Sequence, residues 1–125
     1  MTKFGKTFIR DGAYPEKHEL ETAWFLNSCG KDIEFLVPVR SKGIHTADIV
    51  MDGLLWEIKC PTGKGKRTID NNFKTASKQS ANLIFDLRKI RLPEEQCLSK
   101  LKIELKSRNN IKRLLVISKN NIMLD

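Results

Sequence analysis

The chain has 125 residues, of which 40% are hydrophobic and 30% charged, a balance that fits one packed domain and excludes wholesale disorder. It has no apolar run near the roughly 20 residues that span a bilayer, and no secretory signal is recognisable at its N-terminus. Its three widely spaced cysteines disfavour both a disulfide framework and a structural zinc site. We therefore expect a single domain over residues 1–125 that has no membrane span and acts in a cytoplasm.

The positive charge is concentrated in one part of the chain. The formal net charge is +8, and the window from Lys59 to Arg91 holds nine Lys and Arg residues against Asp70 and Asp86, which leaves only +1 for the rest. A segment this cationic indicates a polyanionic partner such as nucleic acid, although a solvated lysine-rich surface has the same composition.

In the first part of the chain, residues 1–14 are expected to be irregular because glycines interrupt them. A helix is predicted to begin near Pro15, which suits a first helical turn, and to end before Gly30. Its spacing predicts a buried stripe of four residues: Leu20, Ala23, Trp24 and Leu26.

Three strands are predicted next, over residues 33–39, 47–51 and 54–60. Asp52-Gly53 separates the second from the third and is a strong signal for a tight hairpin turn. His45 precedes this hairpin and is expected to be structural. A basic loop follows the third strand.

The remaining elements alternate between helix and strand. The pattern predicts a helix over 69–80, a strand over 83–87, a helix opened by Pro93, and strands over 114–118 and 122–124. This order favours an α/β or α+β domain in which helices flank a mixed central sheet.

Charged residues at the hairpin have the pattern of a metal site. Glu57 and Lys59 are two apart on a strand, so their side chains project to the same face. The Asp52-Gly53 turn folds the preceding strand back and brings Asp48 alongside them. Two carboxylates among apolar neighbours need a partner, and a hard divalent cation is a good one. We expect Mg²⁺ or Mn²⁺, with Zn²⁺ as the alternative, and the Ile58 carbonyl as a third ligand.

These residues resemble a known nuclease motif. Asp48, followed after eight residues by Glu57-Ile58-Lys59, resembles the PD-(D/E)XK motif, with Ala47 in place of the usual proline. The resemblance implies a restriction-endonuclease-like core in which Asp48, Glu57 and Lys59 are catalytic. The simpler interpretation is that the three residues are exposed polar positions on a solvated strand.

Nucleases of this kind often carry a further acidic residue on the first helix. Glu19 is four residues before Ala23 and so falls along the predicted buried stripe, whereas Glu21 points away. Glu19 is therefore the preferred fourth catalytic residue, and Glu21 is the alternative.

A narrower resemblance spans roughly residues 15–124. Three segments look like the C-terminal nuclease domain of contact-dependent growth inhibition toxins: HELETAWFLNSCGKDIEFL, TADIVMDGLLWEIKCPTGKGKRTIDNN and KQSANLIFDLR. The resemblance implies a toxin-like, metal-dependent tRNA nuclease with a cognate immunity protein. The alternatives are a DNA endonuclease on the same core and a non-catalytic nucleic-acid-binding domain.

Polar residues after the motif are candidates for binding nucleic acid. We expect the basic loop to clamp the phosphate backbone, and the predicted helix over 69–80 to lie next to the scissile phosphate. The candidates are Lys64, Lys66, Arg67, Lys74, Lys78 and Gln79.

Overall fold

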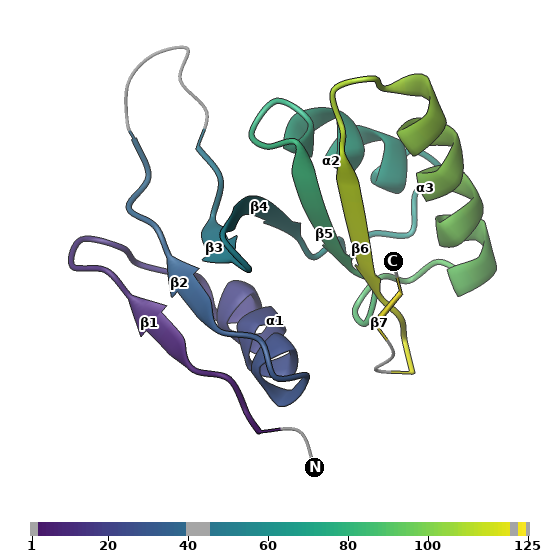
Figure 1. Ribbon diagram of the computed structural model, residues 1–125. Coiled ribbons are helices and arrows are strands. Elements are labelled where there is room, and N and C mark those ends of the chain that lie inside the picture. Colours follow the sequence, from purple (N-terminus) through teal and green to yellow (C-terminus); the bar gives the residue numbers. More distant parts are fainter. Residues whose placement is uncertain (1–2, 40–45, 121–122, 125) are drawn as a thin grey trace.

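The computed structural model describes residues 3–39, 46–120 and, for the backbone alone, 123–124, so His45 lies outside the described residues. Helices and strands follow one another along the chain as Figure 1 shows. They are β1 (Thr7–Ile9), α1 (Lys17–Ser28), β2 (Ile33–Phe35), β3 (Ile49–Met51), β4 (Leu54–Lys59), α2 (Thr68–Ala76), β5 (Asn82–Asp86), α3 (Glu94–Ser107), β6 (Arg113–Ile117) and β7 (Met123–Leu124). The predicted mixed α/β architecture is confirmed.

One sheet of seven strands runs in chain order from β1 to β7. β1 pairs with β2 in parallel, β2, β3 and β4 form an antiparallel meander, β4, β5 and β6 are parallel, and β7 is antiparallel to β6. The predicted turn between β3 and β4 is present. Asp52 and Gly53 have φ values of 54° and 75°, the positive values that a tight type I′ hairpin turn requires at both central positions.

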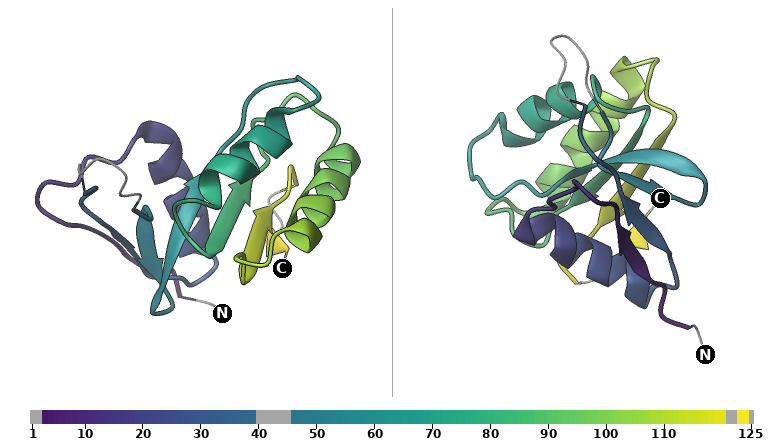
Figure 2. Two further views of the ribbon diagram at one scale, coloured as in Figure 1. Left: turned by 90° about the horizontal axis from the view of Figure 1, so that it is seen from above. Right: turned by 90° about the vertical axis from the view of Figure 1, so that its left-hand side faces the viewer.

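The helices cover opposite faces of the sheet. Alternate residues of β5 show this, since Ile84 packs in the core that includes Leu26 of α1, whereas Phe85 packs in the core formed with α2 and α3. The rings of Phe85 and Phe73 are stacked with centroids 5.7 Å apart. Figure 2 shows α1 on one side of the molecule and α2 and α3 together on the other. None of the described helices is long and apolar enough to cross a bilayer.

The N-terminal segment differs from the prediction, because residues 7–9 form β1 instead of an irregular stretch. Thr7 lies opposite Ile33 in the parallel pair, and so β1 supplies backbone partners to the outer edge of β2. β2 itself ends at Phe35, earlier than the predicted Val39.

The buried face of α1 also differs from the predicted stripe. Leu20 is 39% exposed and Trp24 is 65% exposed, whereas Thr22 and Phe25 are buried with Ala23 and Leu26. Tertiary contacts set this rotation, because the Thr22 hydroxyl bonds to a strand and Trp24 instead packs edge-on against Phe4. The expectation that Trp24 is a core residue was therefore wrong.

Candidate active site

β3 and β4 bring the predicted charged residues together. Ile49 lies opposite Trp56, and the Asp48 N–H bonds to the carbonyl of the same Trp56, so Asp48 lies beside the part of β4 where Glu57 follows. Glu57 and Lys59 project from the face opposite Ile58, which packs in the core beneath α1. Lys59 Nζ lies 3.5 Å from Glu57 Oε2, and the two side chains are 21% and 4% exposed. These residues are not on a solvated strand, although their roles in catalysis stay predictions.

Asp48 is fixed by bonds to β4. Its backbone N–H donates to the Trp56 carbonyl at 2.9 Å, and its Oδ2 accepts a hydrogen bond from the Ile58 N–H at 2.8 Å. The carboxylate thus takes the place of a backbone acceptor where the β3–β4 ladder ends. Because the N–H and C=O of one strand residue point to the same edge of the strand, the Ile58 carbonyl lies on the β3 side of β4.

Glu57 is a buried carboxyl group, and one of its oxygen atoms receives no hydrogen bond from the described residues. Burial is the main cause that raises its pKa to about 9, the Asp48 charge and hydrogen bond add to the rise, and Lys59 opposes it. No described residue donates a hydrogen bond to Glu57 Oε1, which is buried. A cation beside Glu57 would satisfy this oxygen and favour the ionised carboxylate.

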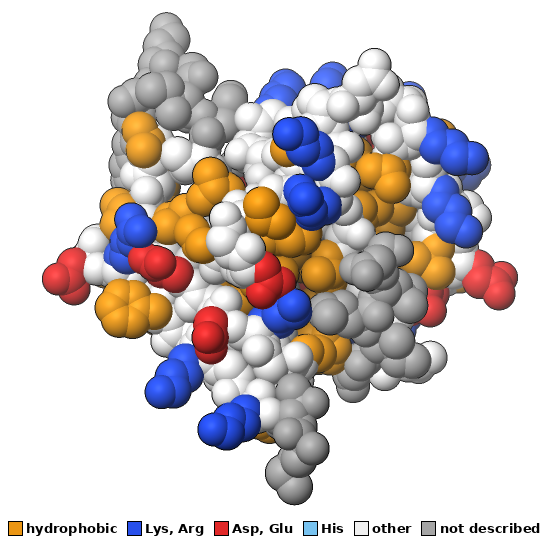
Figure 3. All heavy atoms as spheres, in the orientation of Figure 1, with side chains coloured by type: hydrophobic (Ala, Val, Ile, Leu, Met, Phe, Trp, Pro, Cys, Tyr) orange, Lys and Arg blue, Asp and Glu red, His pale blue; other side chains and the backbone are white. Residues whose placement is uncertain are grey.

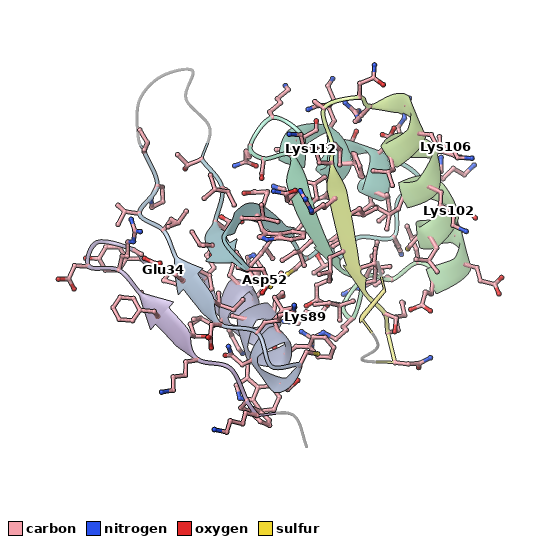
Figure 4. All side chains as sticks on the ribbon, in the orientation of Figure 1. Glu34, Asp52, Lys89, Lys102, Lys106 and Lys112 are labelled. Carbon is pink, nitrogen blue, oxygen red and sulfur yellow. The ribbon has the colours of Figure 1, made fainter. Side chains whose placement is uncertain are left out.

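The structure distinguishes Glu19 from Glu21. The pKa of Glu19 is raised by burial and, among smaller causes, by the charge and hydrogen bond of Asp48. Glu19 also belongs to a capping box, in which its Oε1 accepts from the Glu16 N–H at 2.8 Å. Glu21 instead pairs with Lys89 at 2.8 Å, and Figure 4 shows Lys89 beside α1. Glu19 is thus the helix residue that lies near the Asp48 carboxyl group, with which it lines a common hollow.

The side chains around Asp48 offer oxygen atoms as possible metal ligands. Over the described residues, no group of three or more His, Cys, Asp and Glu side chains is arranged to hold a metal ion. The Asp48 carboxyl group is close enough to both Glu57 and Glu19 to raise their pKa values. Asp48, Glu57 and the Ile58 carbonyl would supply oxygen ligands, and a hydrated Mg²⁺ or Mn²⁺ keeps several waters to complete its shell.

A small hollow opens beside these carboxylates. It has a volume of about 50 Å³ and lies between the segment before α1 and the segment after β2. Its lining residues are Tyr14, Pro15, Glu19, Phe35, Leu36, Pro38 and Asp48. Glu19 and Asp48 thus both line one small hollow at the surface.

Sequence reasoning missed a buried polar cluster that holds α1 in place. Thr22 Oγ1 donates a hydrogen bond to Asp86 Oδ2 at 2.6 Å. It also lies 3.2 Å from the Sγ atom of Cys60, the residue that follows Lys59. The Arg88 guanidinium donates hydrogen bonds to both carboxylate oxygens of Asp86, at 2.9 and 2.7 Å. Burial opposes ionisation of Asp86, but the bonds from Arg88 and Thr22 outweigh it and lower the pKa. The one sequence signal is a carboxylate ending the apolar run LIFD.

The basic candidates lie in two places. Lys64, Lys66 and Arg67 are exposed in the loop between β4 and α2, and Lys74 is exposed on α2. No described residue forms an ion pair with any of these four. On the face that Figure 3 presents, Lys and Arg side chains lie on several sides of a hydrophobic band, including its upper and right-hand margins.

Lys78 and Gln79 are not on the helix where they were predicted. α2 ends at Ala76 instead of Ser80, so both residues lie in the following turn. The Ser80 hydroxyl donates to the Leu55 carbonyl at 2.8 Å, which fastens this turn beside the first half of β4. Gln79 lines a cavity of about 310 Å³ with Leu55 instead of the hollow that contains Asp48.

Comparisons with known proteins agree with this fold and define the family. A solved structure described as a CdiA-CT/CdiI toxin and immunity complex from Burkholderia pseudomallei has the same mixed α/β fold, with a TM-score of 0.65 and 16% identity over 96% of this chain and 97% of that one. The profile of the contact-dependent growth inhibition CdiA C-terminal domain matches residues 45–123. The chain therefore belongs to the CdiA C-terminal domain family and is toxin-like. No curated protein sequence matches it.

Proposed function

We propose that this domain is a metal-dependent endonuclease, with tRNA as its substrate. The observation that carries the proposal is the pairing of Asp48 with Glu57 beside Lys59, in which a buried Glu57 oxygen has no donor among the described residues. This is the arrangement that the PD-(D/E)XK resemblance predicts.

Each residue has a distinct role in phosphodiester hydrolysis. Asp48 and Glu57, with the Ile58 carbonyl, would hold Mg²⁺ or Mn²⁺, which when bound activates water and neutralises charge on a phosphoryl oxygen. Lys59 donates hydrogen bonds to the attacking water or to a phosphate oxygen, and so stabilises charge that grows in the transition state. Glu19 orients water at the Asp48 side of the hollow. Lys64, Lys66 and Arg67 hold the flanking phosphates.

The toxin family supports a specific biological setting. The similar Burkholderia structure is a complex of a toxin with its immunity protein, and we extend that relationship to this chain. A cognate immunity protein would block cleavage in the producing cell. The site of action is then the cytoplasm, where tRNA is found.

Incubation with total tRNA, single-stranded RNA and plasmid DNA tests the proposal. Each substrate is incubated with Mg²⁺, Mn²⁺, Zn²⁺ or EDTA, with Asp48→Asn as the matched inactive control. We expect tRNA cleavage by the parent that requires metal and is absent in Asp48→Asn. Cleavage of plasmid alone would make the domain a DNA endonuclease. Binding without any cleavage would make it a non-catalytic nucleic-acid-binding domain.

A further inference from the structure

An exposed aromatic side chain stands at the rim of the candidate active site. Tyr14, the single tyrosine of the chain, is 86% exposed. It lies in the segment between β1 and α1 and lines the same hollow as Glu19 and Asp48. Pro38, which is exposed, lines this hollow from the segment after β2.

The backbone on both sides of Tyr14 is anchored. Ala13 is buried in the core beneath α1, and its N–H donates to the Arg10 carbonyl at 2.9 Å. Pro15 restricts the backbone on the other side, directly before the Glu16 N-cap. The ring is thus presented to solvent from a fixed support, and its exposure means that it contributes little to the core.

The size of the hollow separates two kinds of ligand group. Its volume of about 50 Å³ has room for only one or two water molecules, at about 30 Å³ each. The hollow is therefore small for a nucleobase, whereas hydration water of an ion or a phosphate oxygen matches its size. A base that follows such a phosphate would have to lie on the rim, where the Tyr14 ring offers a flat apolar face.

We infer that Tyr14 is a stacking platform for the unpaired base next to the scissile phosphate, so that the substrate is cleaved within a single-stranded segment. This inference rests on the proposed nuclease function. A base inside a duplex is covered on both faces by its neighbours, and only an unstacked base can place one face on an aromatic ring. Base–aromatic stacking tolerates any base, so it selects for single-strandedness and not for sequence.

Cleavage of an RNA of about 12 nucleotides tests the inference. The parent, Tyr14→Ala, Tyr14→Phe and Phe8→Ala are compared on the single strand, on its duplex and on a strand with an abasic nucleotide beside the cleaved bond. Phe8 is the matched control because it is an exposed aromatic residue, 67% accessible, that does not line the hollow. Thermal unfolding verifies that each variant is folded.

We expect Tyr14→Ala to lower kcat/KM on the intact single strand by about 5- to 150-fold and to have little effect on the abasic strand. Tyr14→Phe and Phe8→Ala should retain the parental value. Parental activity of Tyr14→Ala, or an equal loss on all three substrates, would overturn the stacking role alone. Failure of the parent to cleave any nucleic acid would instead overturn the proposed function, and the stacking role with it.

Discussion

The Oδ2 atom of Asp48 and the backbone N–H of Ile58 form a 2.8 Å hydrogen bond, which ties the end of β3 to the strand that carries Glu57 and Lys59. The same carboxyl group interacts with Glu57 and with Glu19 of α1. Asp48 is therefore both a structural acceptor and the shared member of two acidic pairs. Its hydrogen bond holds the carboxylate in position before any cation is present.

Two substitutions of Asp48 separate these roles. Asp48→Asn keeps an acceptor for the Ile58 N–H and removes a negative charge, so in EDTA it should be at least as stable as the parent. Asp48→Ala leaves that N–H without a partner and should be less stable than Asp48→Asn by about 1–3 kcal/mol. Both should be inactive. Urea unfolding in EDTA provides the comparison, and equal stability of the two variants would show that the hydrogen bond contributes nothing.

Glu57 should make the metal-free protein sensitive to alkaline pH. Burial and Asp48 raise its pKa to about 9 in the folded state, from an ordinary value of 4.5. Between these values the folded state binds more protons than the unfolded state, so the free energy of unfolding falls as pH rises. The measurement is urea unfolding in EDTA from pH 5 to about 9.

Glu57→Gln should remove most of this slope, unfold at a higher urea concentration than the parent above neutral pH, and lose any stabilisation by Mg²⁺ or Mn²⁺. Glu95→Gln, at an exposed residue of α3, is the matched control and should keep the slope. A slope that persists in Glu57→Gln would assign the proton uptake to another group.

Lys59 should act on rate more than on binding. Its ammonium lies 3.5 Å from Glu57 Oε2, on the face where the attacked phosphate would bind. Removing one such group commonly costs about a hundredfold to a thousandfold in rate. We expect Lys59→Ala to lose most tRNA cleavage while it keeps tRNA binding and a normal thermal transition. Cleavage at the parental rate would refute the assigned site, and unfolding would make Lys59 a structural partner of Glu57.

The relative positions of Asp48, Glu57 and Lys59 could be predicted from the sequence, because they depend on residues close together in the chain. A period of two places Glu57 and Lys59 on one face, and the Asp52-Gly53 turn folds the preceding strand back so that Asp48 bonds to β4 beside them. These relations depend on a few neighbouring residues. The order of the later helices and strands followed from apolar runs for the same reason.

Long-range contacts explain what the sequence could not provide. The rotation of α1 depends on the bond from Thr22 to Asp86, which are 64 residues apart, and so Leu20 and Trp24 were misassigned to the core. β1 forms because its backbone pairs with the edge of β2, and residues 7–9 alone do not indicate this pairing. Tyr14 was not identified at all, because only the folded chain places it beside Glu19.

The loop between β4 and α2 should supply much of the salt dependence of nucleic-acid binding. Each phosphate contact releases counterions and adds about one to the salt slope. Replacing Lys64, Lys66 and Arg67 together with Gln should weaken tRNA binding and lower the slope by about two to three. Filter binding across a series of salt concentrations gives the slope.

The matched control is a triple Gln substitution of Lys102, Lys106 and Lys112, which are exposed and lie on α3 or before β6 in Figure 4. It removes the same charge away from the β4–α2 loop. An equal reduction in slope for both triple variants would show that net charge, and not the loop, governs binding.

The last prediction concerns Thr22, which should position Glu19 without touching substrate. Its hydroxyl donates to Asp86 at 2.6 Å and is fully buried, so α1 is held against the ends of β4 and β5 one turn away from Glu19. Thr22→Val keeps the shape of the side chain but removes this donor. We expect a loss of about 1–3 kcal/mol in the free energy of unfolding. We also expect slower cleavage, because the helix that carries Glu19 loses its anchor.

Thr22→Ser is the informative control, because it retains the hydroxyl and should recover most of the cleavage rate even if the lost methyl group costs some stability. Cleavage is measured well below the unfolding temperature of each variant, so that a fall in kcat reports on the folded protein. The KM for tRNA should stay near the parental value, since Thr22 lies away from the substrate. If Thr22→Val loses stability but cleaves at the parental kcat, the bond between Thr22 and Asp86 stabilises the fold alone, and the position of Glu19 does not depend on it.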